Sequence, residues 1–127
     1  MLYLYDIGFS DDDIRELLEI NPELSNLLEE EIVQLVAVLK NINCSESIIK
    51  NIITSNSFYL NRCAEDVTEL IYKLESLGIK RLDITFDSNP WLLNKDAFEI
   101  DDYIEEQQKL GKSLEDIIDS IDMGMVD

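Results

Sequence analysis

Apolar residues recur at helical spacing along nearly the whole chain. Between Ile32 and Leu39 they follow the i, i+3, i+4, i+7 series that marks one face of an α-helix. Residues 2–5 are open to three interpretations: an extended segment, the end of a helix, or a packed tail. The pattern predicts helices over 11–20, 28–40, 46–55, 64–77, 99–110 and 114–122, with a shorter helix near 82–87.

Start and stop signals flank these predicted helices. Ser10, Ser45 and Ser113 each precede acidic residues, and a serine hydroxyl is a good helix N-cap while carboxylates suit the positive end of the helix dipole. The stop signals are residues suited to a left-handed conformation after a helix. They are Gly8, Asn43, Gly78 and Gly111.

Self-comparison of the chain uncovers an internal repeat. A shift of 35 residues places Ile14 on Ile49, and a further shift of 33 places Asn56 on Asn89. Periods of this length are typical of stacked supersecondary units that bury their apolar faces against one another. We therefore predict an all-α fold, a short α-solenoid of about three repeats in one domain. Its parts are the repeats at about 7–41, 42–76 and 77–109 and a terminal helix at 113–122, within a single domain of residues 1–127.

The repeat unit carries a recognisable motif. In the first copy it comprises Gly8-Phe9-Ser10, Leu17-Leu18 and Asn21-Pro22-Glu23-Leu24, and the third copy contains Asn89-Pro90-Trp91-Leu92-Leu93. Over about residues 5–121 the chain resembles the mitochondrial transcription termination factor (mTERF) repeat. The second copy departs from the motif because its asparagine, Asn56, is followed by no proline. The resemblance implies a curved α-solenoid, in which each unit has two helices and a short third turn, and a basic groove that binds nucleic acid.

The composition of the chain argues against nucleic acid as a ligand and against catalysis. The 127 residues include 28 Asp and Glu, 10 Lys and Arg and no His, for a formal net charge of −18. Without histidine there are no Ser-His or Cys-His pairs and no His-ligated metals. Two cysteines are too few for a disulfide framework, and no apolar run is long enough to span a bilayer. We expect a cytoplasmic protein that is not an enzyme and has no cofactor or metal.

The distribution of basic residues also disfavours nucleic acid as a direct partner. Only Lys80 and Arg81 are adjacent, whereas phosphate binding needs several bases on one face. The acidic surface repels a duplex or an anionic membrane, so we expect the partner to be a basic protein surface, such as that of a nucleic-acid-binding protein. That the acidity serves only solubility remains the plainer alternative.

Two predicted helices concentrate the acidic residues that would meet such a partner. The candidate binding residues are Asp11, Asp12, Asp13, Glu16, Glu19, Glu99, Asp101, Asp102, Glu105 and Glu106. The first hypothesis is a nucleic-acid mimic that inhibits a DNA- or RNA-binding protein, as phage anti-defence and anti-CRISPR proteins do. The alternatives are an mTERF-like nucleic-acid-binding regulator and a helical module that binds a peptide or oligomerises. The regulator would gather five bases on its concave side: Lys73, Lys80, Arg81, Lys109 and Lys112.

The aromatic residues after the first helices, and the cysteines, have simpler interpretations. We expect Phe58, Tyr59 and Trp91 to pack one repeat onto the next. Cys44 occupies the repeat position of Phe9, which favours a small core residue over a reactive thiol.

Overall fold

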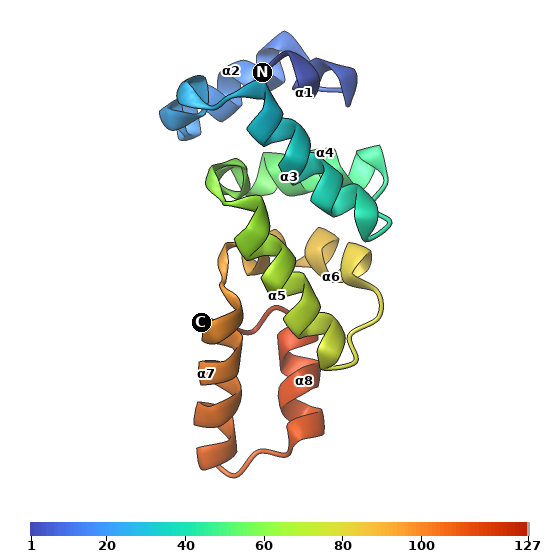
Figure 1. Ribbon diagram of the computed structural model, residues 1–127, viewed down its shortest axis with the longest axis vertical. Coiled ribbons are helices and arrows are strands. Elements are labelled where there is room, and N and C mark those ends of the chain that lie inside the picture. The colour runs from blue at the N-terminus through green and yellow to red at the C-terminus, as the bar shows by residue number, and fades with distance from the viewer. Residues whose placement is uncertain (127) are drawn as a thin grey trace.

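The computed structural model describes residues 1–126, and every regular element within them is helical (Figure 1). The first helices of the three repeats are α2 (Asp11–Ile20), α4 (Glu46–Ser55) and α6 (Leu82–Ser88). The second helices are α3 (Glu29–Asn41), α5 (Ala64–Ser76) and α7 (Ala97–Lys109). Between them lie the short 3-10 helices η1 (Pro22–Asn26), η2 (Ser57–Asn61) and η3 (Pro90–Asn94). Each repeat is therefore two helices and one short turn of helix, as the motif implied.

Two further helices flank the repeats. α1 (Leu2–Asp6) precedes them and packs on α3, and α8 (Leu114–Asp122) follows them and packs on α7. The interpretation of residues 2–5 as helical is thus the correct one. The short helix predicted near 82–87 is present as α6, although Arg81 at its start provides no side-chain cap.

Like elements stack on like elements. The second helices form one row, in which α3 packs on α5 and α5 on α7, and α1 extends this row by packing on α3. Among the first helices α4 packs on α6, and the 3-10 helices pack on one another. The result is an elongated array with α1 and α2 at one end and α7 and α8 at the other (Figure 1). Residues about 33 to 35 positions apart in sequence therefore lie side by side in the structure.

The predicted helix boundaries follow from local hydrogen bonding. The hydroxyls of Ser10, Ser45 and Ser113 accept hydrogen bonds from backbone N–H groups three residues ahead, at 3.1, 3.2 and 3.2 Å. After the preceding helices the chain turns through positive φ, from 71° at Asn43 to 105° at Gly8. These contacts satisfy backbone groups that a helix end leaves unpaired.

The apolar faces form one continuous core. The isoleucines of α4, Ile49, Ile52 and Ile53, are fully buried because the middle repeat is covered on both sides. Tyr59 is also fully buried and its hydroxyl donates to the carbonyl oxygen of Leu35 at 2.6 Å. Burying each such side chain contributes about 1.5–3 kcal/mol.

The aromatic residues pack one repeat onto the next as expected, but only Tyr59 does so inside the core. Phe58 is 41% exposed and Trp91 56% exposed. Their rings contact each other across adjacent repeats, with centroids 6.3 Å apart. Because a 3-10 helix has three residues per turn, neighbouring positions point in different directions, and only some can face the core.

Asparagines at the ends of the first helices join consecutive repeats. The Asn21 amide donates to the carbonyl oxygen of Ser57 at 3.4 Å, and the Asn56 amide donates to that of Pro90 at 2.9 Å. Since both asparagines are buried, each needs a partner of this kind.

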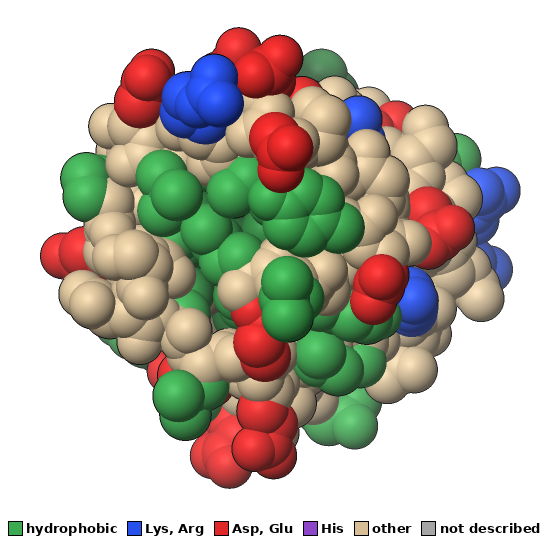
Figure 2. Space-filling model, turned by 90° about the horizontal axis from the view of Figure 1, so that it is seen from above, with side chains coloured by type: hydrophobic (Ala, Val, Ile, Leu, Met, Phe, Trp, Pro, Cys, Tyr) green, Lys and Arg blue, Asp and Glu red, His purple; other side chains and the backbone are tan. Residues whose placement is uncertain are grey.

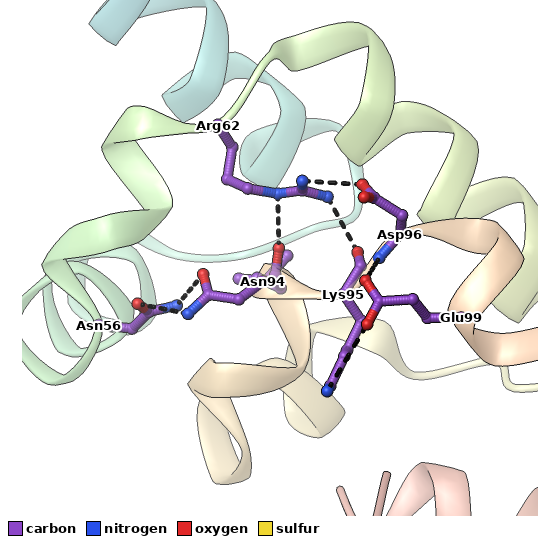
Figure 3. Close-up of polar contacts among 7 residues, drawn as sticks. Asn56, Arg62, Asn94, Lys95, Asp96 and Glu99 are labelled. Atoms are coloured by element: carbon purple, nitrogen blue, oxygen red, sulfur yellow. Dashed lines mark hydrogen bonds and ion pairs between the residues drawn. The ribbon is translucent and has the colours of Figure 1, made fainter. Parts of the chain in front are cut away.

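Arg62 forms a second link between repeats (Figure 3). It donates to the carbonyl oxygens of Leu93 and Lys95 at 3.1 and 2.9 Å and pairs with the Asp96 carboxylate at 2.8 Å. Because Asp96 caps α7, this link holds the start of α7 against the segment that precedes α5.

Candidate acidic binding surface

The acidic residues of α7 differ in how far their charges are already neutralised. Asp101 pairs with Lys73 of α5 at 2.7 Å, and Glu105 pairs with Lys109 at 3.3 Å. Asp102 and Glu106 are exposed and lack an ion pair within residues 1–126. They are one helical turn apart on the same face, so α7 presents a pair of free carboxylates.

Glu99 has a structural role at the start of the same helix. Its Oε1 accepts from the Asp96 N–H at 3.0 Å, which closes a capping box, and its other oxygen lies 3.8 Å from the Lys95 Nζ (Figure 3). The Glu99 carboxylate also lines a shallow hollow with Asp102 and Glu106. It therefore adds negative charge to this surface while it is held in place.

The neighbouring helix α5 enlarges the acidic surface. Asp66 and Glu69 of α5 line a second hollow together with Asp101 and the exposed ring of Phe98. Sequence reasoning missed the two α5 residues. The signal was present in the repeat, because a shift of 33 places Asp66 on Glu99 and Glu69 on Asp102. From here on, the α5–α7 acidic surface means Asp66, Glu69, Glu99, Asp101, Asp102, Glu105 and Glu106.

Several of the acidic residues of α2 are engaged in contacts that stabilise the fold. Asp13 closes a capping box with Ser10 and pairs with Lys50 of α4 at 3.2 Å. The backbone hydrogen bond from Ser10 and the contact with Lys50 lower the pKa of Asp13. Asp11 accepts from the Tyr5 hydroxyl at 2.6 Å, and Asp12 pairs with Arg15 at 3.1 Å.

Three α2 candidates stay exposed without an ion pair in the described part of the chain: Asp11, which accepts the Tyr5 hydrogen bond, and Glu16 and Glu19. α2 lies at the opposite end of the array from α7 (Figure 1). The ten predicted residues therefore belong to two separate surfaces. Seen from the α2 end, apolar side chains gather in the middle of the surface and acidic side chains lie around them (Figure 2).

Most of the basic residues form contacts with other residues of the same chain. Across residues 1–126, seven of the ten form ion pairs: Arg15, Lys50, Arg62, Lys73, Arg81, Lys95 and Lys109. Lys40 instead donates to the Tyr3 hydroxyl at 3.2 Å. Of the five bases that a nucleic-acid groove would gather, only Lys80 and Lys112 are left without an ion pair within the same residues.

Groups that could support catalysis or metal binding have ordinary structural surroundings. Cys44 is buried, and burial raises the pKa of its thiol to about 12. Within residues 1–126 no three Cys, Asp or Glu side chains are placed to hold a metal ion. No helix in the described part of the chain has the length and hydrophobicity needed to cross a bilayer.

Stacked units of helix, 3-10 helix and helix, joined by asparagines at the ends of the first helices, define an α-solenoid of helical repeats. The mTERF family model matches residues 1–122, so the chain belongs to the mTERF family. No curated protein and no solved structure matches the chain. The family consists of non-enzymatic nucleic-acid-binding repeat proteins, which is compatible with a non-catalytic role here.

Proposed function

We propose that this mTERF-family chain is a non-catalytic binding protein whose α5–α7 acidic surface engages a basic surface of another protein. The observation that carries the proposal is the imbalance between the two kinds of charge. Within residues 1–126, seven of the ten bases are held in intramolecular ion pairs, whereas Asp102 and Glu106 face solvent without one. A basic partner would gain favourable contacts here, and a polyanion would not.

Charge complementarity of this kind affects the rate of association and its salt dependence. Opposite potentials steer two proteins together, and salt screens the attraction over about 8–10 Å. In its sharper form the proposal is a nucleic-acid mimic. The carboxylates of α5 and α7 would take the places of phosphates on a DNA- or RNA-binding protein, as in an inhibitor of the phage anti-defence or anti-CRISPR type.

Affinity capture with two matched variants tests this proposal. The α7 variant is Asp101→Asn, Asp102→Asn, Glu105→Gln and Glu106→Gln. The α2 variant is Asp11→Asn, Asp12→Asn, Glu16→Gln and Glu19→Gln. Each removes four negative charges and leaves the capping residues Asp13 and Glu99 intact. Each bait is exposed to nuclease-treated lysate of the source cell at low and at moderate salt, and captured proteins are identified.

The expected result is a nucleic-acid-binding protein retained by the wild type and the α2 variant, lost by the α7 variant, and competed by DNA or RNA. Equal loss with both variants would mean that overall charge, and no particular surface, governs retention. Unchanged capture by the α7 variant would exclude its four substituted carboxylates as the contact and would overturn the proposal.

Direct nucleic-acid binding is the second candidate function, and family membership favours it. Its bases would include Lys80 and Lys112, which lie in the connections after α5 and α7. The test is retention of labelled duplex DNA and single-stranded RNA at low salt by the wild type and by a Lys80→Ala, Lys112→Ala variant. Retention that this variant loses would establish the second candidate in place of the first.

A further inference from the structure

An apolar groove lies between α3 and α5, next to the acidic surface. Val38, Ile42 and Ile71 contribute its apolar side chains, and Asn41, Thr68, Tyr72 and Glu75 complete the lining. The groove has a volume of about 160 Å³. Tyr72 is 67% exposed although it is a large aromatic residue. An exposed aromatic side chain beside an apolar groove is a typical anchor point in protein interfaces.

The opposite flank of α5 has a different character. There Asp66 and Glu69 line a hollow with the exposed ring of Phe98 and with Asp101, which is already paired with Lys73. Carboxylates together with an aromatic face suit a Lys or Arg side chain, because the cation gains both ionic and cation–π contacts. One helix, α5, thus separates an apolar subsite from a cation-binding subsite.

We propose that α5 is the centre of a docking site for an amphipathic helix of another protein, with apolar residues in the α3–α5 groove and Lys or Arg in the α5–α7 hollow. This inference rests on the proposed function and names the shape of the partner. The two subsites lie on either side of one helix, so the distance between them is about one helix spacing, 8–10 Å. A helix that crosses α5 covers this distance in nearly two turns. With a rise of about 1.5 Å per residue, the partner then carries its apolar anchor and its basic residues about six positions apart.

Charge selects this occupant over the alternatives. A second copy of the chain would bring another surface of net charge −18 against the acidic hollow. Nucleic acid and anionic lipid are repelled for the same reason. A basic helix is attracted by the hollow and still has an apolar face for the groove.

A designed peptide of about 20 residues provides the probe, since helix-in-groove ligands of this length are common. It carries leucines along one face and lysines on the other, and its companion is a scrambled peptide of the same composition with no apolar face. Binding is followed by fluorescence anisotropy, and the contact surface by NMR amide shifts. We expect shifts confined to α3, α5 and α7, and at least about tenfold weaker binding of the scrambled peptide.

Three variants separate the inference from the proposed function. Tyr72→Ser removes the groove anchor, Ile84→Ser is its control because Ile84 is an exposed apolar residue of α6, and the α7 variant removes charge. We expect Tyr72→Ser to weaken binding of the amphipathic peptide about tenfold and Ile84→Ser to leave it unchanged.

Each contrary outcome has its own meaning. No binding of the amphipathic peptide, equal binding of both peptides, or no effect of Tyr72→Ser would overturn the docking site while leaving a purely electrostatic surface in place. Undiminished binding by the α7 variant would overturn the proposed function while leaving the apolar groove.

Discussion

Asn56 and Asn94 form a reciprocal amide pair across two repeats. The Asn56 Nδ2 donates to the Asn94 Oδ1 at 3.0 Å, and the Asn94 Nδ2 donates back to the Asn56 Oδ1 at 3.2 Å (Figure 3). Asn56 is fully buried and also donates to the Pro90 carbonyl oxygen. One side chain therefore connects the end of α4 with both ends of η3.

Replacing Asn56 should be costly. Asn56→Ala leaves the carbonyl oxygen of Pro90 and the Asn94 amide without these partners, and we expect the free energy of unfolding to fall by about 1–3 kcal/mol. Urea denaturation followed by Trp91 fluorescence measures the change. Asn61→Ala is the control: this exposed residue makes one long hydrogen bond to Asn21, at 3.3 Å, and should cost about 0.5 kcal/mol or less. Equal losses of unfolding free energy in the two variants would show that the Asn56–Asn94 pair stabilises the repeats no more than an exposed hydrogen bond does.

Arg62 should not tolerate a conservative change to lysine. Its side chain is 16% exposed, and its guanidinium reaches two carbonyl oxygens and the Asp96 carboxylate at once. A lysine ammonium cannot match that planar geometry, so Arg62→Lys should destabilise the protein by about 1–2 kcal/mol. The matched control is Arg15→Lys, since Arg15 is 70% exposed and its one ion pair within residues 1–126 is with Asp12. The effect of this change should lie within about 0.5 kcal/mol. Thermal or urea unfolding measures the loss of stability in each variant. Similar losses in Arg62→Lys and Arg15→Lys would refute the bridging role of Arg62.

The two cysteines should differ sharply in reactivity. Cys63 is exposed, whereas Cys44 is buried and burial raises the pKa of its thiol to about 12. Because the thiolate is the reacting form, native protein should take up one equivalent of iodoacetamide and urea-unfolded protein two, as read by intact mass. A Cys63→Ser variant should stay unmodified while folded. Rapid labelling of that variant would mean that Cys44 is accessible.

Asp83 should contribute stability that acid removes. Two hydrogen bonds from the Arg81 guanidinium, at 3.1 and 3.0 Å, lower the pKa of Asp83 below its ordinary value of 3.8. A lowered pKa in the folded state means that the contribution is complete above pH 3.8 and is lost as pH falls through the folded pKa. Acid also relieves repulsion among the other carboxylates, so the useful quantity is the difference in unfolding free energy between the wild type and Asp83→Asn.

That difference should shrink as the pH is lowered from 5 to 2. Glu16→Gln supplies the baseline, because Glu16 is exposed and lacks an ion pair within residues 1–126. A wild-type advantage over Asp83→Asn that is constant across this range would show that the ion pair does not shift the titration of Asp83.

Local signals in the sequence were sufficient for the secondary structure and the repeat. The helix around Ile32 and Leu39 and the caps at Ser10, Ser45 and Ser113 depend on residues within one or two turns, and such short-range spacing is visible in a single chain. The asparagine-proline motif similarly identified the family. The net charge of −18 and the lack of histidine also needed only the sequence.

The binding surface depended on tertiary structure. Whether a carboxylate is paired is decided by helices far apart in sequence. Asp101 pairs with Lys73, whereas Asp102 beside it has no ion pair in the described part of the chain. Likewise, Phe58 is exposed and Tyr59 buried because the stacking of η2 allows only one of them to face the core. Periodicity determines which face of a helix is apolar, but stacking determines which helix lies opposite it. That is why Asp66 and Glu69 joined the acidic surface, and Tyr72 an apolar groove, only once α3, α5 and α7 were placed side by side.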